Sequence, residues 1–278
     1  MSIATHNRLE TGKVTRLEPF EPIHPMAVIH PTARLGRNVT VGPFSVIGAD
    51  VVIGDRTEIM NHVTIQGPTT IGQENRFFPY CSIGQDPQDK KFAGQTPSLL
   101  EIGDRNVFRE FVTIHRGTPT GRGCTSVGHD NWIMAYCHIA HDCRVGNHVI
   151  FANGVTLGGH VTIQDMVYLG GITAIHQYCE VGELVMTGGH TMIAQDVPPY
   201  VIAAGNRARL FGVNKIGMER NGVSEVELRN IQKAYRIFFR GKEPAKEALA
   251  RLERELAFSP GVKNFVAFIR QSERGICR

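Results

Sequence analysis

The sequence predicts a parallel β-helix followed by a small α-helical domain, and three observations predict this fold. A large apolar residue recurs every six residues, a small residue stands four positions after most of these, and the period stops at Val197-Pro198-Pro199. Six residues per face and three faces per coil make a triangular prism in which each coil pairs with the next. We therefore divide the chain into an N-terminal extension (1–22), a β-helix (23–200) and a helical domain (201–278).

The large apolar residues form three runs. They extend without a slip from Ile23 to Ile83, resume from Ile102 to Ile114, and continue from Val127 to Ile193, with Thr187 as the polar exception. One large and one small inward side chain per hexad is typical of a short strand and a turn, and the frequent glycine after the large residue indicates a tight or positive-φ backbone. Four cysteines occupy the small position, and we interpret them as core residues. They are Cys81, Cys137, Cys143 and Cys179.

Two breaks in the phase predict loops that leave the prism. The steps from Ile83 to Ile102 and from Ile114 to Val127 each exceed a multiple of six by one residue. The first segment is polar and charged, and the second is rich in glycine and threonine. Because loops on a rigid scaffold often carry binding and catalytic residues, we expect function there.

The helical domain begins with a capping box formed by Ser224 and Glu227, followed by apolar residues on one helix face. Breaks at 241–244 and at Pro260-Gly261 indicate two further helices. Residues 205–278 carry 16 Lys and Arg against 8 Asp and Glu (+8), which leaves 14 against 18 (−4) for residues 1–204. This basic end would suit an acidic partner or be a solvated helical surface. The charges stand at helical spacing without a recognition motif, which disfavours nucleic acid.

The composition, 42% hydrophobic and 20% charged, is that of a folded protein and excludes a low-complexity disordered chain. No apolar run approaches the roughly 18 residues that span a bilayer, and the start of the chain lacks the apolar part of a signal peptide. We therefore expect no integral membrane segment and a cytoplasmic location.

Histidines gather on the later coils. His141 and His160 follow Ile139 and Leu157, which are 18 residues or one coil apart, so we expect the two imidazoles to lie about 4.8 Å from each other, and His176 to continue the column. Three interpretations compete. The histidines are exposed polar residues, or zinc ligands, or a general base that takes a proton from an attacking hydroxyl. Imidazole titrates near pH 6.5 and suits the last role.

The repeat resembles the hexapeptide-repeat acyltransferases, which implies a left-handed parallel β-helix. The resemblance narrows at IAHDC (139–143), HRGT (115–118), GGH (158–160), HQ (176–177), QDVPPYVIAAGN (195–206) and FGVN (211–214). In this order, these motifs resemble the UDP-N-acetylglucosamine O-acyltransferase family. That implies transfer of a 3-hydroxyacyl chain from acyl carrier protein to the sugar 3-hydroxyl, the first step of lipid A synthesis.

The resemblance also implies roles for individual residues. His141 would be the general base, Asp142 would orient it, and the Gly159 N–H would stabilise the oxyanion. No metal or other cofactor would be needed besides the carrier-bound 3-hydroxyacyl thioester. Gly189 matches the position that limits acyl length, and a glycine leaves room for a long chain. The substrate-binding residues would be Gln88, Asp89, Lys91, His138, His160, Gln177, Asn214 and Arg220.

Two departures from the family pattern lie near position 220. Ile216 stands where the family often has glutamate, and Asn221 where it often has a second arginine. The resemblance further implies a homotrimer with sites between subunits, and a basic helical domain that receives acidic acyl carrier protein.

Four alternative functions stay open from the sequence. A related N-acyltransferase carries an added N-terminal uridine-binding domain, for which the 22 residues before the first hexad are too few. The others are a coenzyme A-dependent acetyltransferase, a zinc-dependent hydratase and a non-catalytic scaffold. The acceptor atom, oxygen or nitrogen at the sugar 3-position, is not fixed by the sequence.

Overall fold

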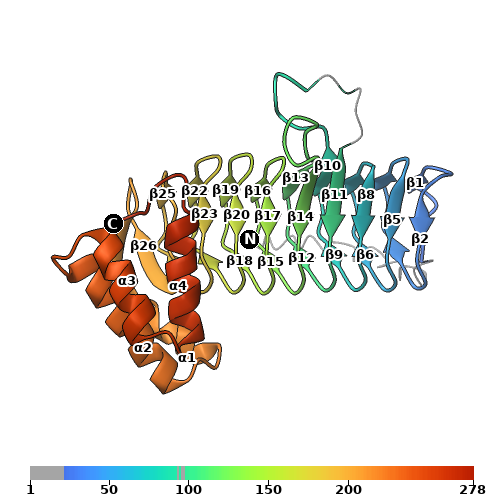
Figure 1. The fold of residues 1–278 in the computed structure, drawn as a ribbon. Coiled ribbons are helices and arrows are strands. Elements are labelled where there is room, and N and C mark those ends of the chain that lie inside the picture. Colours follow the sequence, from blue (N-terminus) through green and yellow to red (C-terminus); the bar gives the residue numbers. More distant parts are fainter. Residues whose placement is uncertain (1–21, 93, 95–97) are drawn as a thin grey trace, which may run out of the picture.

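The computed structural model describes residues 22–92, 94 and 98–278. Most of the predicted N-terminal extension, residues 1–21, lies outside the described residues. The chain forms a long prism of stacked coils with a bundle of helices at its C-terminal end (Figure 1). Among the described residues, no helix is both long and apolar enough to cross a membrane.

Three sheets form the faces of the prism, and the chain visits them in turn. The first sheet contains β1 (Val28–Ile29), β4 (Val46–Ile47), β7 (Thr64–Ile65), β10 (Ser82–Gln85), β13 (Thr113–His115), β16 (His138–Ile139), β19 (Thr156–Leu157), β22 (Ala174–Ile175) and β25 (Met192–Ile193). The second contains β2 (Arg34–Leu35), β5 (Val51–Ile53), β8 (Thr69–Ile71), β11 (Leu99–Ile102), β14 (Cys124–Val127), β17 (Arg144–Val145), β20 (Thr162–Ile163) and β23 (Glu180–Val181). The third contains β3 (Thr40–Val41), β6 (Glu58–Ile59), β9 (Arg76–Phe77), β12 (Val107–Phe108), β15 (Trp132–Ile133), β18 (Ile150–Phe151), β21 (Tyr168–Leu169), β24 (Met186–Thr187), β26 (Val201–Ala204) and β27 (Arg209–Val213).

The strands pair in parallel with the next coil, so the predicted β-helix is confirmed. In an uninterrupted coil, each large apolar residue pairs with the one 18 positions later, as Ile29 pairs with Ile47. From Val39 onward the large and small hexad positions are buried, including the four cysteines, whereas those of the first coil are partly buried. Three hexads carry an asparagine at the small position, and Asn75, Asn106 and Asn131 are buried too. Their amide oxygens accept hydrogen bonds from the backbone of the following coil, which satisfies these polar groups inside the core.

The sequence predicts a tight or positive-φ backbone at the repeated glycines, and the structure shows tight packing at most of them, with a positive φ at Gly84 (φ 73°). Gly54, directly after a strand, has no positive φ; a Cβ there would lie 2.5 Å from the carbonyl carbon of Gly72 on the next coil, so close stacking requires the glycine. The positive φ falls two residues later, usually on a larger side chain such as Asp142 (φ 60°) or His160 (φ 64°). Non-glycine residues rarely adopt this conformation, but here the coil repeats it at most corners.

We name each edge of the prism by the two sheets that the chain joins there. Both phase breaks are excursions at edge 1–2, where the chain passes from the first sheet to the second. The first excursion joins β10 to β11, and the second joins β13 to β14. They rise side by side from one place on the prism (Figure 1).

The prism extends beyond the predicted boundary at residue 200. β26 pairs in parallel with β24, and β27 then turns back antiparallel to β26. The period alone ended the β-helix too early because this final hairpin does not follow the hexad.

The helices that follow are α1 (Lys215–Arg220), α2 (Glu225–Tyr235), a π-helical turn η1 (Arg236–Arg240), α3 (Ala245–Glu255) and α4 (Pro260–Gln271). Ser224 caps α2 as predicted, accepting a hydrogen bond from Glu227 N. The Glu227 carboxylate does not close the capping box. It instead accepts hydrogen bonds from Ser259 Oγ and Gly261 N, both 2.6 Å away, and so ties the start of α4 to α2.

Candidate active site

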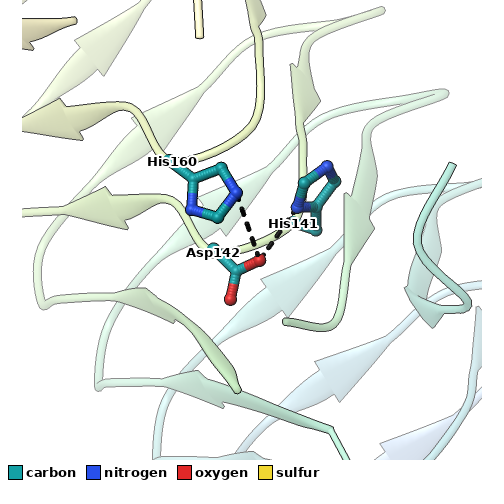
Figure 2. A group of neighbouring side chains, drawn as sticks. All are labelled: His141, Asp142 and His160. Carbon is teal, nitrogen blue, oxygen red and sulfur yellow. Dashed lines mark hydrogen bonds and ion pairs between the residues drawn. The ribbon is translucent and has the colours of Figure 1, made fainter. Parts of the chain in front are cut away.

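His141 and Asp142 lie on edge 1–2, between β16 and β17. His141 Nδ1 is 2.9 Å from Asp142 Oδ2, and Figure 2 shows the two side chains converging. Because a carboxylate oxygen only accepts, Nδ1 carries the proton in this pair. The lone pair of Nε2 is therefore available to a substrate.

The second excursion encloses the Asp142 side chain, which has no exposed surface. Backbone N–H groups of Thr118, Arg122 and Gly123 donate to its carboxylate at 2.9–3.1 Å, and Thr118 Oγ1 donates at 2.6 Å. Gly121 passes so close that a Cβ on it would lie 2.4 Å from Asp142 Oδ2. The second excursion thus surrounds the Asp142 carboxylate and supplies most of its hydrogen-bond donors.

These hydrogen bonds decide the charge of Asp142. Burial alone would raise the pKa of the carboxyl, but the hydrogen bonds from His141 and Thr118 outweigh burial and lower the pKa to about 2. Asp142 is therefore ionised at neutral pH and holds the His141 imidazole in one tautomer and orientation.

His160 lies on the next coil, as predicted, with its ring centroid 5.1 Å from that of His141. Its Nε2 is 3.8 Å from Asp142 Oδ2 (Figure 2). Burial lowers the pKa of His160. The column then continues with Tyr178, whose ring stacks on His160 at 4.4 Å. The prediction that His176 continues the column is wrong because the 18-residue step from His160 leads to Tyr178.

Gly159 lies against the His141 ring, and a Cβ on it would be 2.7 Å from His141 Nε2. The residue is buried, and within the described part of the chain nothing accepts a hydrogen bond from its N–H. A buried donor without a partner is costly, so its presence beside the free imidazole nitrogen indicates a place for a ligand oxygen.

A cavity of about 640 Å³ opens over this group. The first excursion forms one wall, and the coils that carry His141, His160 and Gln177 form the other. Its lining residues are Gln88, Asp89, Lys90, Lys91, Thr120, His141, His160, Gln177 and Tyr178.

The outer face of the first sheet carries two further histidines beside the cavity. His138 Nδ1 is 2.7 Å from Thr113 Oγ1, and the ring packs edge-on against His115. Burial and the neighbouring histidines lower the pKa of His138 to about 4, and burial also lowers the pKa of His115. Both imidazoles are therefore neutral at neutral pH, which leaves the local positive charge to lysines and arginines.

Comparison with known proteins now identifies the family. The sequence model described as "Udp N-acetylglucosamine O-acyltransferase; Domain 2" matches residues 196–277, and that described as "Bacterial transferase hexapeptide (six repeats)" matches residues 124–159. The acyl-[acyl-carrier-protein]–UDP-N-acetylglucosamine O-acyltransferase of Halorhodospira halophila is 48% identical over 213 residues, which is 77% of this chain and 82% of that protein. The chain belongs to the UDP-N-acetylglucosamine O-acyltransferase family.

Solved structures of the family have the same fold. The Moraxella catarrhalis UDP-N-acetylglucosamine O-acyltransferase is 39% identical and covers 93% of this chain and 100% of its own, with a TM-score of 0.89. The Arabidopsis UDP-N-acetylglucosamine acyltransferase is 34% identical and covers 92% of this chain and 100% of its own, with a TM-score of 0.81.

Six of the residues that the family resemblance implied line this cavity, and Asp142 and Gly159 adjoin it. The other four do not line it. His138 is held by Thr113, and Gly189 is on edge 3–1, where the chain passes from the third sheet to the first. Arg220 ends α1 and is exposed.

Asn214 is the fourth and is buried. Its amide Nδ2 donates to Leu184 O at 2.8 Å, and its Oδ1 accepts from Gly217 N at 3.1 Å as the cap of α1. Both ends of the amide are therefore engaged within the chain, where they cap α1 and hold it to the prism, and the role of Asn214 in substrate binding stays a prediction.

Several residues of the site were not predicted. Tyr178 was detectable, because it stands 18 positions after His160. Thr118 and Gly121 gave no such signal, since they belong to an excursion whose path the hexad does not describe. Lys90 and Thr120 also line the cavity from the excursions.

Within the described chain, one group of side chains has metal-ligand spacing, namely His141, Asp142 and His160, with ligand atoms within 4.8 Å of one another. The Asp142 oxygens already accept five hydrogen-bond donors from the protein. A zinc ion would have to displace some of them, which disfavours the metal site considered from the sequence.

Proposed function

We propose that the protein transfers a 3-hydroxyacyl chain from acyl carrier protein to the 3-hydroxyl of UDP-N-acetylglucosamine, the first step of lipid A synthesis. The observation that carries the proposal is the Nε2 of His141 beside the N–H of Gly159, both without a hydrogen-bond partner among the described residues, at the wall of a cavity. A base next to an oxyanion donor is the arrangement that acyl transfer requires.

In the proposed reaction, His141 Nε2 takes the proton of the sugar 3-hydroxyl while that oxygen attacks the thioester carbonyl. Negative charge develops on the carbonyl oxygen and is stabilised by the Gly159 N–H. Ionised Asp142 stabilises the imidazolium. The tetrahedral intermediate collapses, the C–S bond breaks, and the imidazolium returns the proton to the carrier thiolate.

The cavity walls suit the acceptor. Asp89 would accept hydrogen bonds from sugar hydroxyls, Lys91 would bind phosphate, and Gln88, His160 and Gln177 would complete the polar wall. His138 would add a contact from the adjacent sheet face.

An apolar surface suits the acyl chain. Trp132, Tyr168 and Met186 point outward on the third sheet in one register row, and each is about 40% exposed. Gly189 lies just past Met186, at the adjoining edge. We infer that it ends the acyl path, so that Gly189→Met would shift the preferred donor toward shorter chains in a panel of graded acyl carrier proteins.

The division of these residues between two edges supports a homotrimer. His141 lies on edge 1–2, whereas Gly189 and the apolar row lie at or beside edge 3–1. A site that uses both would form where edge 1–2 of one subunit faces edge 3–1 of another. A row of partly exposed large apolar side chains is a candidate interface surface. Light scattering of the purified protein would show three chains.

The helical end suits an acidic carrier. Arg236, Arg240 and Lys242 are exposed, and no carboxylate of the described residues lies within ion-pair distance of them. Association with acyl carrier protein should therefore weaken as salt is raised. The carrier and the nucleotide sugar would both be met in the cytoplasm.

We infer that the reaction needs no metal, since the general base, its carboxylate partner and an oxyanion donor are all supplied by the chain. Activity should survive prolonged treatment with a chelator. Loss of activity that zinc restores would instead favour the hydratase-like site.

Mass spectrometry of the product tests the proposal. UDP-N-acetylglucosamine and 3-hydroxyacyl carrier protein should give a sugar ester and free carrier thiol. Transfer to the 3-amino sugar alone, or from acyl coenzyme A alone, would overturn the assigned acceptor or donor. Failure to bind either substrate would favour a scaffold.

A further inference from the structure

The last residues of the chain fold back onto the end of the prism, where Figure 1 places the C terminus beside β25 and β26. Asp196 fixes this tail. Its carboxylate accepts from Ser272 Oγ at 2.6 Å, its N–H donates to Gly275 O at 2.9 Å, and its carbonyl accepts from Cys277 N at 2.8 Å. The Cys277 side chain is buried beneath the tail. Arg274, between these anchors, is therefore held in place although it is exposed.

Arg274 meets a histidine from the prism. Its Nη2 is 3.0 Å from His176 Nδ1, a contact between residues 98 positions apart. The same nitrogen lies 3.1 Å from Gln177 O, so its two contacts do not fix the tautomer of His176. The Arg274 guanidinium stays protonated and only donates, so it brings a fixed positive charge to this place.

The pair is linked to the cavity through the sequence neighbours of His176. His176 directly precedes Gln177, which lines the cavity together with Tyr178. His176, Gln177 and Arg274 are all exposed. A fixed arginine with spare N–H groups suits an acceptor-rich anion, and phosphate oxygens are the ligand that such a fork binds best.

We propose that the C-terminal tail contributes Arg274 to the site, where its guanidinium binds a phosphate oxygen of the nucleotide diphosphate. The inference rests on the proposed function for the identity of the nucleotide sugar.

Calorimetric titration with UDP, and steady-state kinetics with both substrates, test this role. Arg274→Ala should weaken UDP binding and raise the KM for UDP-N-acetylglucosamine by about 10- to 100-fold, since a charge-assisted hydrogen bond is lost. The kcat and the KM for acyl carrier protein should stay within about twofold. Arg274→Lys should lie between, because it keeps the charge without the fork.

Arg278→Ala is the matched control, since Arg278 belongs to the same tail but lies over the Phe238 ring. It should leave UDP binding unchanged.

If Arg274→Ala unfolds the tail, Arg274→Gln keeps a donor for His176 and removes only the charge, and its UDP affinity decides the question. Unchanged UDP binding in a folded variant overturns the proposal. So does an increase confined to the KM for acyl carrier protein, because the phosphate would then be that of the donor. UDP titration needs no transfer, so a wild-type protein that binds UDP but makes no ester would refute the proposed reaction alone.

Discussion

Two edges of the prism share one backbone geometry and carry different chemistry. At edge 3–1, the positive-φ position holds Phe44, His62, Tyr80, Phe111 and Tyr136, whose rings stack with centroids 4.8–5.1 Å apart. At edge 1–2, the same position holds Asp142, His160 and Tyr178. Stacked coils bring corner residues to about 5 Å whatever their type. Rings at that spacing form a row, whereas a carboxylate and imidazoles form a proton-transfer group.

The excursions make the second difference. Edge 3–1 has none, and its rings stay partly exposed, while edge 1–2 has both, and they cover Asp142 and wall the cavity. A regular coil thus supplies spacing, and an irregular insertion supplies burial and hydrogen bonds. The proposed catalytic residues lie on edge 1–2, which has both the regular stacked corners and the excursions.

The largest expected effect comes from removing the proposed general base at edge 1–2. His141→Ala should lower kcat by at least about 100-fold and up to about 10,000-fold, because the general base is removed. His148→Ala is the matched control, since His148 is an exposed positive-φ histidine on the remaining edge. Wild-type turnover by a folded His141→Ala protein would contradict the assignment.

The next prediction concerns the charge of Asp142. Its folded-state pKa of about 2 lies below the ordinary value of 3.8, so the ionised group stabilises the fold above about pH 4, and this contribution is lost as the pH falls from about 4 toward 2. The loss should be about 2 kcal/mol of unfolding free energy, at about 1.4 kcal/mol per pKa unit. Denaturant unfolding at pH 6 and pH 2.5 would show it in the wild type and not in Asp142→Asn. Equal pH dependence in the two proteins would refute it.

A smaller effect is expected from the second excursion, whose contribution can be tested while the coil residues are left unchanged. Thr118→Val removes one hydroxyl donor from Asp142 while keeping the side-chain shape, and kcat should fall by about 10-fold because the carboxylate loses a charge-assisted hydrogen bond. Thr118→Ser should restore most of the rate, and the KM for the nucleotide sugar should not change. A KM effect without a kcat effect would show that Thr118 serves substrate binding instead.

The smallest effect belongs to the aromatic edge. Tyr136 ends the ring row and, among the described residues, stacks on Phe111 alone. Tyr136→Ala should lower the unfolding free energy by about 1 kcal/mol, the contribution of one ring pair. Tyr136→Phe should retain it. A Tyr136→Ala protein as stable as the wild type would mean that the rings share an edge without stabilising each other.

The sequence by itself determined the prism, because a six-residue period fixes three faces and an 18-residue coil. It also determined that His141 and His160 are neighbours, since that contact follows from one coil step. It misplaced the column at His176 through a slip of phase. At the repeated glycines it left a tight and a positive-φ backbone open, and the structure shows that close packing between coils is the requirement at most of them.

Only the tertiary structure decided which groups surround His141 and Asp142. The path of an excursion does not repeat, so no period predicts that Thr118 hydrogen-bonds Asp142 or that Arg274 contacts His176, 98 positions away. Nor does it predict that the Gly159 N–H has no partner among the described residues. Local spacing fixes contacts between adjacent coils. Contacts made by insertions and by the tail depend on where the whole chain packs, and these are the contacts that set charge, orientation and access at the site.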